Sequence, residues 1–133
     1  MRTRHGWIVV VLLAVLFGAG CSEDWCKHEA SAMAMVSAVM PTLHMLAPDK
    51  ASVLSTSLET AHSGVLAVGC DGDKKTLGER VGRVAELAVS ALTLYGQLRH
   101  RSLDVPVITE AERLQAISDL TRLQAGIARE IER

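Results

Sequence analysis

Apolar residues recur every three or four positions along most of this chain, which is the spacing of amphipathic helices. Four segments carry this pattern, and they cover 24–47, 49–68, 76–101 and 110–132. The rhythm is clearest in the third segment, where Leu77, Val81 and Val84 are spaced four and then three residues apart. No segment alternates strictly between apolar and polar residues, so the pattern gives no support to strands. The sequence therefore predicts an all-α fold.

Helix-start signals agree with these boundaries. A threonine followed three residues later by a glutamate can form a capping box, in which each side chain bonds the backbone N–H of the other residue. Thr76 with Glu79 and Thr109 with Glu112 have this spacing, and Pro48 suits the first position of the second helix. Four amphipathic helices with short connections predict a small antiparallel four-helix bundle.

The N-terminus has a different character from the rest of the chain. Arg2 and Arg4 precede an unbroken apolar run over 7–17, and small residues then lead to Cys21. A membrane-spanning helix needs about 20 apolar residues, so this shorter run is typical of a secretory signal. An ordinary signal peptide would be cut near Ala19 or Gly20 and would leave Cys21 as a free thiol.

The stretch Leu16-Phe17-Gly18-Ala19-Gly20-Cys21 resembles the lipobox of bacterial lipoproteins. One position departs from that pattern, since Gly18 stands where leucine is usual. The resemblance implies that the chain is cut before Cys21, which then carries the lipid as the new N-terminus. Ser22 follows, and in lipoproteins of two-membrane bacteria this residue is compatible with transfer to the outer membrane. The resemblance thus implies a lipid-anchored protein of the cell envelope, in the outer membrane and facing the periplasm.

This likeness divides the chain into three parts. They are a removed signal peptide over 1–20, a lipidated N-terminus with a short tether over 21–25, and a four-helix domain over 26–133. Because the tether is short, we expect the domain to sit against its membrane, with Trp25 at the level of the lipid headgroups.

The two remaining cysteines are expected to form a disulfide, because exported proteins meet oxidising conditions. Cys26 and Cys70 are equally far in sequence from Pro48, which lies in the predicted turn between the first two helices. Residues equidistant from the turn of an antiparallel hairpin lie opposite each other. The spacing therefore predicts a Cys26–Cys70 disulfide, although Pro41 should kink or break the first helix and shift the register.

Composition excludes several classes of function. A net charge of −1 argues against a nucleic-acid-binding surface, and 3% aromatic residues argue against stacking platforms. The sequence contains neither a Gly-x-Ser-x-Gly elbow nor a glycine-rich phosphate loop, so we predict no catalytic residue, no enzyme activity and no cofactor.

Methionine and histidine cluster in the first helix, and such residues in exported proteins can bind copper(I). The cluster comprises His28, Met33, Met35, Met40, His44 and Met45. We expect Met33 and Met40 to lie on the buried stripe together with Val36 and Leu43, where methionine fills gaps. Core packing is thus favoured and no metal site is assigned, with a copper or small-ligand binder as the alternative.

The first and third helices carry more apolar residues than one buried stripe needs. The surplus residues that we predict to bind a partner are Met35, Val39, Leu46, Leu87 and Leu94. A second apolar face indicates either burial at the centre of the bundle or a groove for a partner's amphipathic helix.

The combination of a lipid anchor, a short helical domain and one disulfide is similar to helical pilotins, the lipoproteins that escort secretin subunits to the outer membrane. That resemblance implies an accessory protein that chaperones or docks a membrane-proximal envelope protein. An immunity or exclusion lipoprotein is the alternative.

Overall fold

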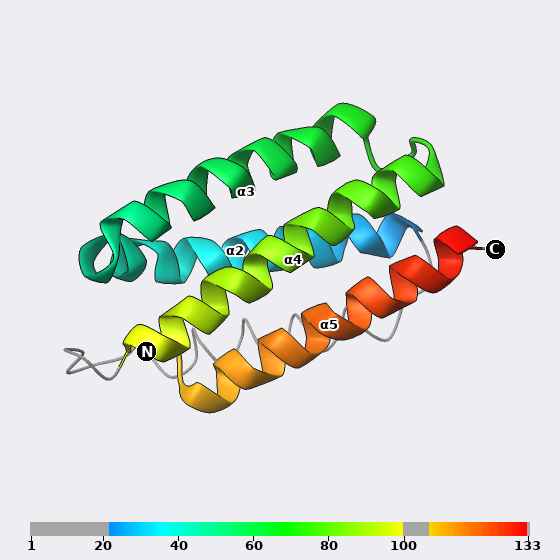
Figure 1. The fold of residues 1–133 in the computed structure, drawn as a ribbon. Helices are drawn as coiled ribbons and strands as arrows, with labels where there is room; N and C mark the ends of the chain where they lie inside the picture. Colours follow the sequence, from blue (N-terminus) through cyan, green and yellow to red (C-terminus); the bar gives the residue numbers. More distant parts are fainter. Residues whose placement is uncertain (1–21, 100–106, 133) are drawn as a thin grey trace.

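The computed structural model describes residues 22–99 and 107–132, and within them it consists of four helices joined by turns. The helices are α2 (Ser22–Leu46), α3 (Pro48–Val68), α4 (Lys74–Leu98) and α5 (Glu110–Glu132) (Figure 1). The prediction of a small all-α bundle is confirmed. Cys21 and the proposed signal peptide lie outside the described residues.

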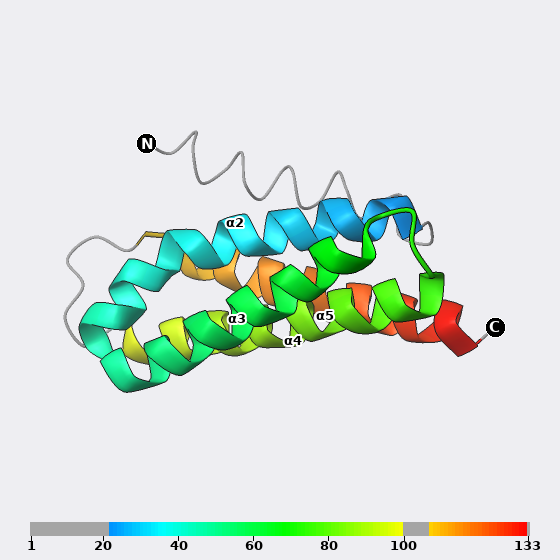
Figure 2. The same cartoon turned by 90° about the horizontal axis from the view of Figure 1, so that it is seen from above.

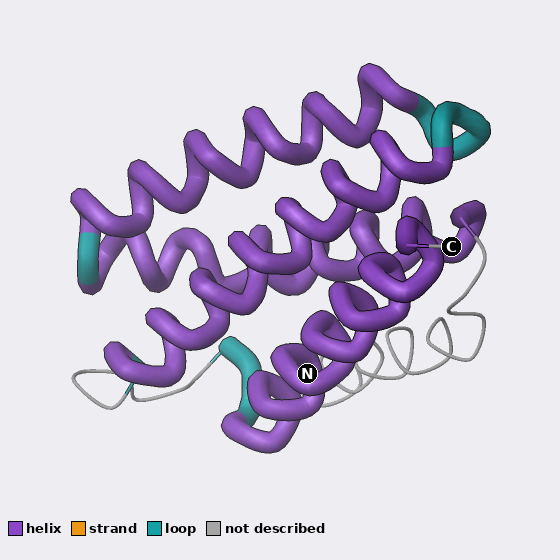
Figure 3. The backbone as a smooth tube through the Cα atoms, turned by 45° about the vertical axis from the view of Figure 1, so that its right-hand side comes forward, coloured by secondary structure: helices purple, strands orange, loops and turns teal. Residues whose placement is uncertain are grey.

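Helix α4 is the centre of the bundle. It packs against α2, α3 and α5, whereas α2 and α5 make little contact with each other (Figures 1 and 2). Each helix runs opposite to the one before it, and short turns join α2 to α3 and α3 to α4 (Figure 3). Contact with three neighbours explains why α4 has buried residues over much of its circumference, among them the small Ala85, Ala88 and Ala91.

Small residues let neighbouring helices approach α4 closely. A Cβ atom built on Gly78 would lie 2.7 Å from Ile131 Cδ1 and 3.0 Å from the ring of Trp25.

At the other end of α4, the hydroxyl of Tyr95 accepts a hydrogen bond of 2.9 Å from the backbone N–H of Val107. This bond fixes the entry into α5, where Ile108 is fully buried.

The buried stripe of α2 differs from the predicted one. Val36 and Leu43 are buried as expected, but Met33 and Met40 are only half-buried, and Met35 is buried in their place. The physical reason is that Val36 and Leu43 lie between two apolar faces of α2, one with Met33 and Met40 and the other with Met35. The spacing of apolar residues is compatible with burial of either face, and packing against α4 buries the face with Met35.

Pro41 lies within its helix, and one predicted helix start needs correction. Pro41 does not break α2, which continues to Leu46 with its last turns bending toward α3 (Figure 2). Helix α4 begins earlier than predicted, because Asp73 and not Thr76 is its N-cap. The Asp73 carboxylate accepts bonds from both the backbone N–H and the hydroxyl of Thr76, and these bonds lower its pKa.

The N-cap of α5 confirms its prediction. Thr109 Oγ1 accepts from the backbone N–H of Glu112 at 3.0 Å, and Glu112 Oε1 accepts from the backbone N–H of Thr109 at 3.1 Å. Pro48 also occupies the first turn of α3, as predicted.

Cys26 and Cys70 form the predicted disulfide, with their Cα atoms 6.0 Å apart. The bond joins the start of α2 to the turn after α3, at the end of the bundle where α5 finishes (Figure 1). Trp25, next to the bond, is only 1% exposed, with the Lys74 ammonium 5.9 Å from its ring centre. The expectation that Trp25 lies among lipid headgroups is therefore wrong for this fold, because the side chain packs in the core.

Candidate functional site

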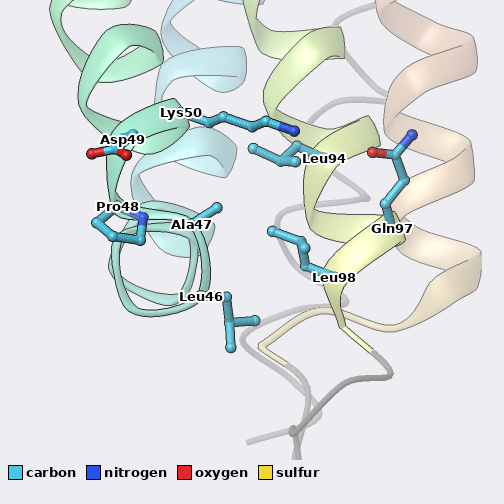
Figure 4. Close-up of a pocket in the computed structure, with 8 residues that line it drawn as sticks. All are labelled: Leu46, Ala47, Pro48, Asp49, Lys50, Leu94, Gln97 and Leu98. Carbon is cyan, nitrogen blue, oxygen red and sulfur yellow. The ribbon is translucent and has the colours of Figure 1, made fainter.

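The end of the bundle opposite the disulfide is hollowed between α3 and α4. A cavity of about 320 Å³ lies where α2 turns into α3 and α4 ends (Figure 4). Its lining residues are Leu46, Ala47, Pro48, Asp49, Lys50, Leu94, Gln97 and Leu98. A neighbouring hollow of about 450 Å³ shares three of these residues and adds Val53 and Leu54. We call the two together the distal groove.

The tight connection between α2 and α3 shapes this groove. Ala47 alone separates the two helices, and its N–H donates to the Leu43 carbonyl at 2.8 Å while its own carbonyl accepts from the Ala51 N–H at 2.9 Å. Because Ala47 is small and Pro48 fixes the first turn of α3, the reversal leaves the gap toward α4 unfilled. Leu46 and Leu98 face that gap from the two sides (Figure 4).

The side chain of Lys50 extends from α3 across the groove toward Leu94, whereas the Asp49 carboxylate points away (Figure 4). No ion pair joins Lys50 to another of the described residues. The side-chain amide of Gln97 lies on the α4 side of the groove. The groove thus combines an apolar floor with one cation and one amide at its rim.

Apolar side chains dominate the lining of this surface. Val53, in the groove, is 67% exposed. A hollow lined mainly by apolar side chains with a few polar groups is typical of a binding site. The arrangement can therefore bind apolar groups.

The structure brings two of the five predicted partner-binding residues into this groove, Leu46 and Leu94. Leu87 is buried on α4 outside the groove, and Met35 and Val39 are buried in α2. These three residues are therefore buried within the bundle, which was the alternative to a partner-binding groove. Spacing in the sequence missed Lys50, Val53 and Leu54, because it could not show where α3 meets α4.

Two arginines close to the groove, Arg99 and Arg113, form ion pairs with Glu110. Glu110 accepts from Arg99 at 2.7 Å and from Arg113, which lies over Gly96 of α4. The bonds from Arg113 and Arg99 lower the pKa of Glu110 to about 2. This network ties the start of α5 to the end of α4 and keeps both guanidinium groups engaged.

A second polar cluster bridges α2 and α3 near the disulfide. The buried Glu29 carboxylate pairs with the half-buried ring of His62, at Nδ1. By the symmetry about Pro48 that pairs the two cysteines, His62 would lie opposite Ala34, but its ring contacts Glu29, which is more than one helical turn away along α2. Beside Glu29, His28 is buried with Nε2 unpartnered among the described residues, and burial lowers its pKa.

Helix α5 also buries a carboxylate. Asp119 is 1% exposed, with Oδ1 accepting from the side-chain amide of Gln115 at 2.8 Å and Oδ2 without a partner among the described residues. Burial raises its pKa. Neither polar cluster forms a metal centre, since within 22–99 and 107–132 no three His, Cys, Asp or Glu side chains group around a common point.

Comparison with protein-family models, with curated proteins and with solved structures gave no match. Among the described helices, none has the length and apolar character needed to cross a bilayer.

Proposed function

We propose that this chain is a lipid-anchored accessory protein of the bacterial envelope that docks an apolar segment of another envelope protein in the distal groove. The observation that carries the proposal is the groove itself, an apolar hollow whose lining includes the exposed Val53. The lipobox-like sequence ending at Cys21 supports the anchor.

The proposed anchor and the groove belong to opposite ends of α2. The helix begins at Ser22, directly after Cys21, and ends at Leu46 in the groove. Its 25 residues correspond to a length of about 37 Å at 1.5 Å per residue. The length of α2 therefore separates the groove from the proposed lipid.

Site-specific photo-crosslinking in the native host tests the docking function. A photo-reactive amino acid at Val53 should capture one envelope protein, because this residue lies in the groove. Leu66 provides a matched control, since it is on the same helix, is also 67% exposed and lies outside the groove. Equal capture at both positions, or capture at neither, would contradict docking at the groove.

The identity of the captured protein separates the candidate roles. A secretin subunit supports a pilotin-like role, and a toxin or a phage component supports an immunity or exclusion role. The anchor is tested separately by metabolic labelling with an alkyne fatty acid, for which Cys21→Ser is the control. Loss of label in this variant supports lipidation, and label retained on it would contradict the assignment.

A further inference from the structure

We propose that the distal groove takes an amphipathic helix that carries a carboxylate beside its apolar anchor residues, and that Lys50 pairs with this carboxylate. The inference rests on the proposed docking function and adds to it the chemistry of the partner.

The apolar part of the argument comes from the two hollows. They have volumes of about 320 and 450 Å³ and share Asp49, Lys50 and Leu94. The groove follows α3 from Ala47 to Leu54, a distance of about 10 Å at 1.5 Å per residue. Two turns of a helix cover the same distance, so a helix lying along α3 would place apolar side chains i and i+7 at the two ends of the groove.

The charge of the groove selects the polar residue of the partner. Lys50 lies across the groove without an ion pair among the described residues, and Asp49 points away (Figure 4). The groove also borders the N-terminus of α3, where Ala47 provides no side-chain cap and the helix dipole is positive. The nearby Arg99 and Arg113 are already paired with Glu110. A carboxylate on the partner is therefore attracted to Lys50.

Peptide binding tests this inference on the mature lipidated protein in lipid nanodiscs. The probes are two fluorescent synthetic helices with leucines at i and i+7, which differ only in having Glu or Lys at position i+3. Fluorescence anisotropy should show the Glu peptide binding about tenfold more tightly, because attraction replaces repulsion at the rim. Lys50→Glu should reverse this preference, and Lys75→Glu, far from the groove, should leave it unchanged.

Two results would overturn the inference: absence of binding by both peptides, or a preference unchanged by Lys50→Glu. Circular dichroism of each variant establishes that it is folded. If crosslinking at Val53 still captures one protein while the peptides fail, the docking function stands and the proposed partner chemistry is wrong. If both experiments fail, the docking function is wrong as well.

Discussion

Replacing Cys26 and Cys70 together by serine should lower the free energy of unfolding by about 4 kcal/mol. The disulfide joins residues separated by 44 positions, and closing a loop of this size removes entropy of about 13 cal/mol/K from the unfolded chain. At 25 °C this corresponds to about 4 kcal/mol. Domains are typically stable by about 5–15 kcal/mol, so the bond supplies a large part of the stability.

Urea unfolding followed by circular dichroism at 222 nm provides the measurement. The double variant should unfold at lower urea, and its m-value should rise because the unfolded chain is no longer constrained by the loop. Cys26→Ser alone serves as a control and should lose a similar amount, since either cysteine is sufficient to remove the bond. A loss below about 1 kcal/mol in the double variant would refute the loop-entropy argument.

Further predictions concern packing and pH. Gly82→Ala should raise the free energy of unfolding by up to about 1 kcal/mol, since nothing lies within 4 Å of the added Cβ. Gly78→Ala should lower it by about 1–3 kcal/mol, because the added Cβ would crowd Ile131. Equal urea midpoints for the two variants would contradict both predictions. Burial raises the pKa of Asp119, so the contribution of this group to stability should fall as pH rises above 3.8, and Asp119→Asn should remove that part of the pH dependence. Burial lowers the pKa of His28, so the contribution of this second group should fall in the opposite direction, as pH drops below 6.5, and His28→Gln should remove it. Urea unfolding measured from about pH 3.5 to about pH 8 gives the free energy of unfolding as a function of pH. Either prediction is contradicted if its variant shows the same pH dependence as the unsubstituted protein.

Local sequence signals predicted the helices well, because they act within one or two turns. The capping box of Thr109 and Glu112 forms as expected, and Pro48 starts its helix. Competition between local signals explains the error at α4. Asp73 and Thr76 are both good N-caps, and Asp73 accepts from the Thr76 N–H, so the helix begins one turn earlier than the capping box implied.

Contacts between helices could be predicted only where they follow from the alignment of two consecutive helices about the turn that joins them. Symmetry about a single turn was sufficient to pair Cys26 with Cys70. The same symmetry failed for His62, whose long side chain reaches Glu29 on a different turn of α2. The distal groove was beyond this reasoning, because Lys50 and Leu94 meet only through the packing of α3 on α4.

The position of the groove separates binding from stability. The disulfide and the buried Trp25 hold one end of the bundle, while Glu110 with its two arginines ties α5 to α4 at the other. The rim residues Lys50 and Val53 belong to neither set of contacts and are exposed. Substitutions at surface positions of this kind usually change stability by less than about 0.5 kcal/mol. Changes in partner capture by such variants can therefore be attributed to the groove and not to unfolding of the bundle.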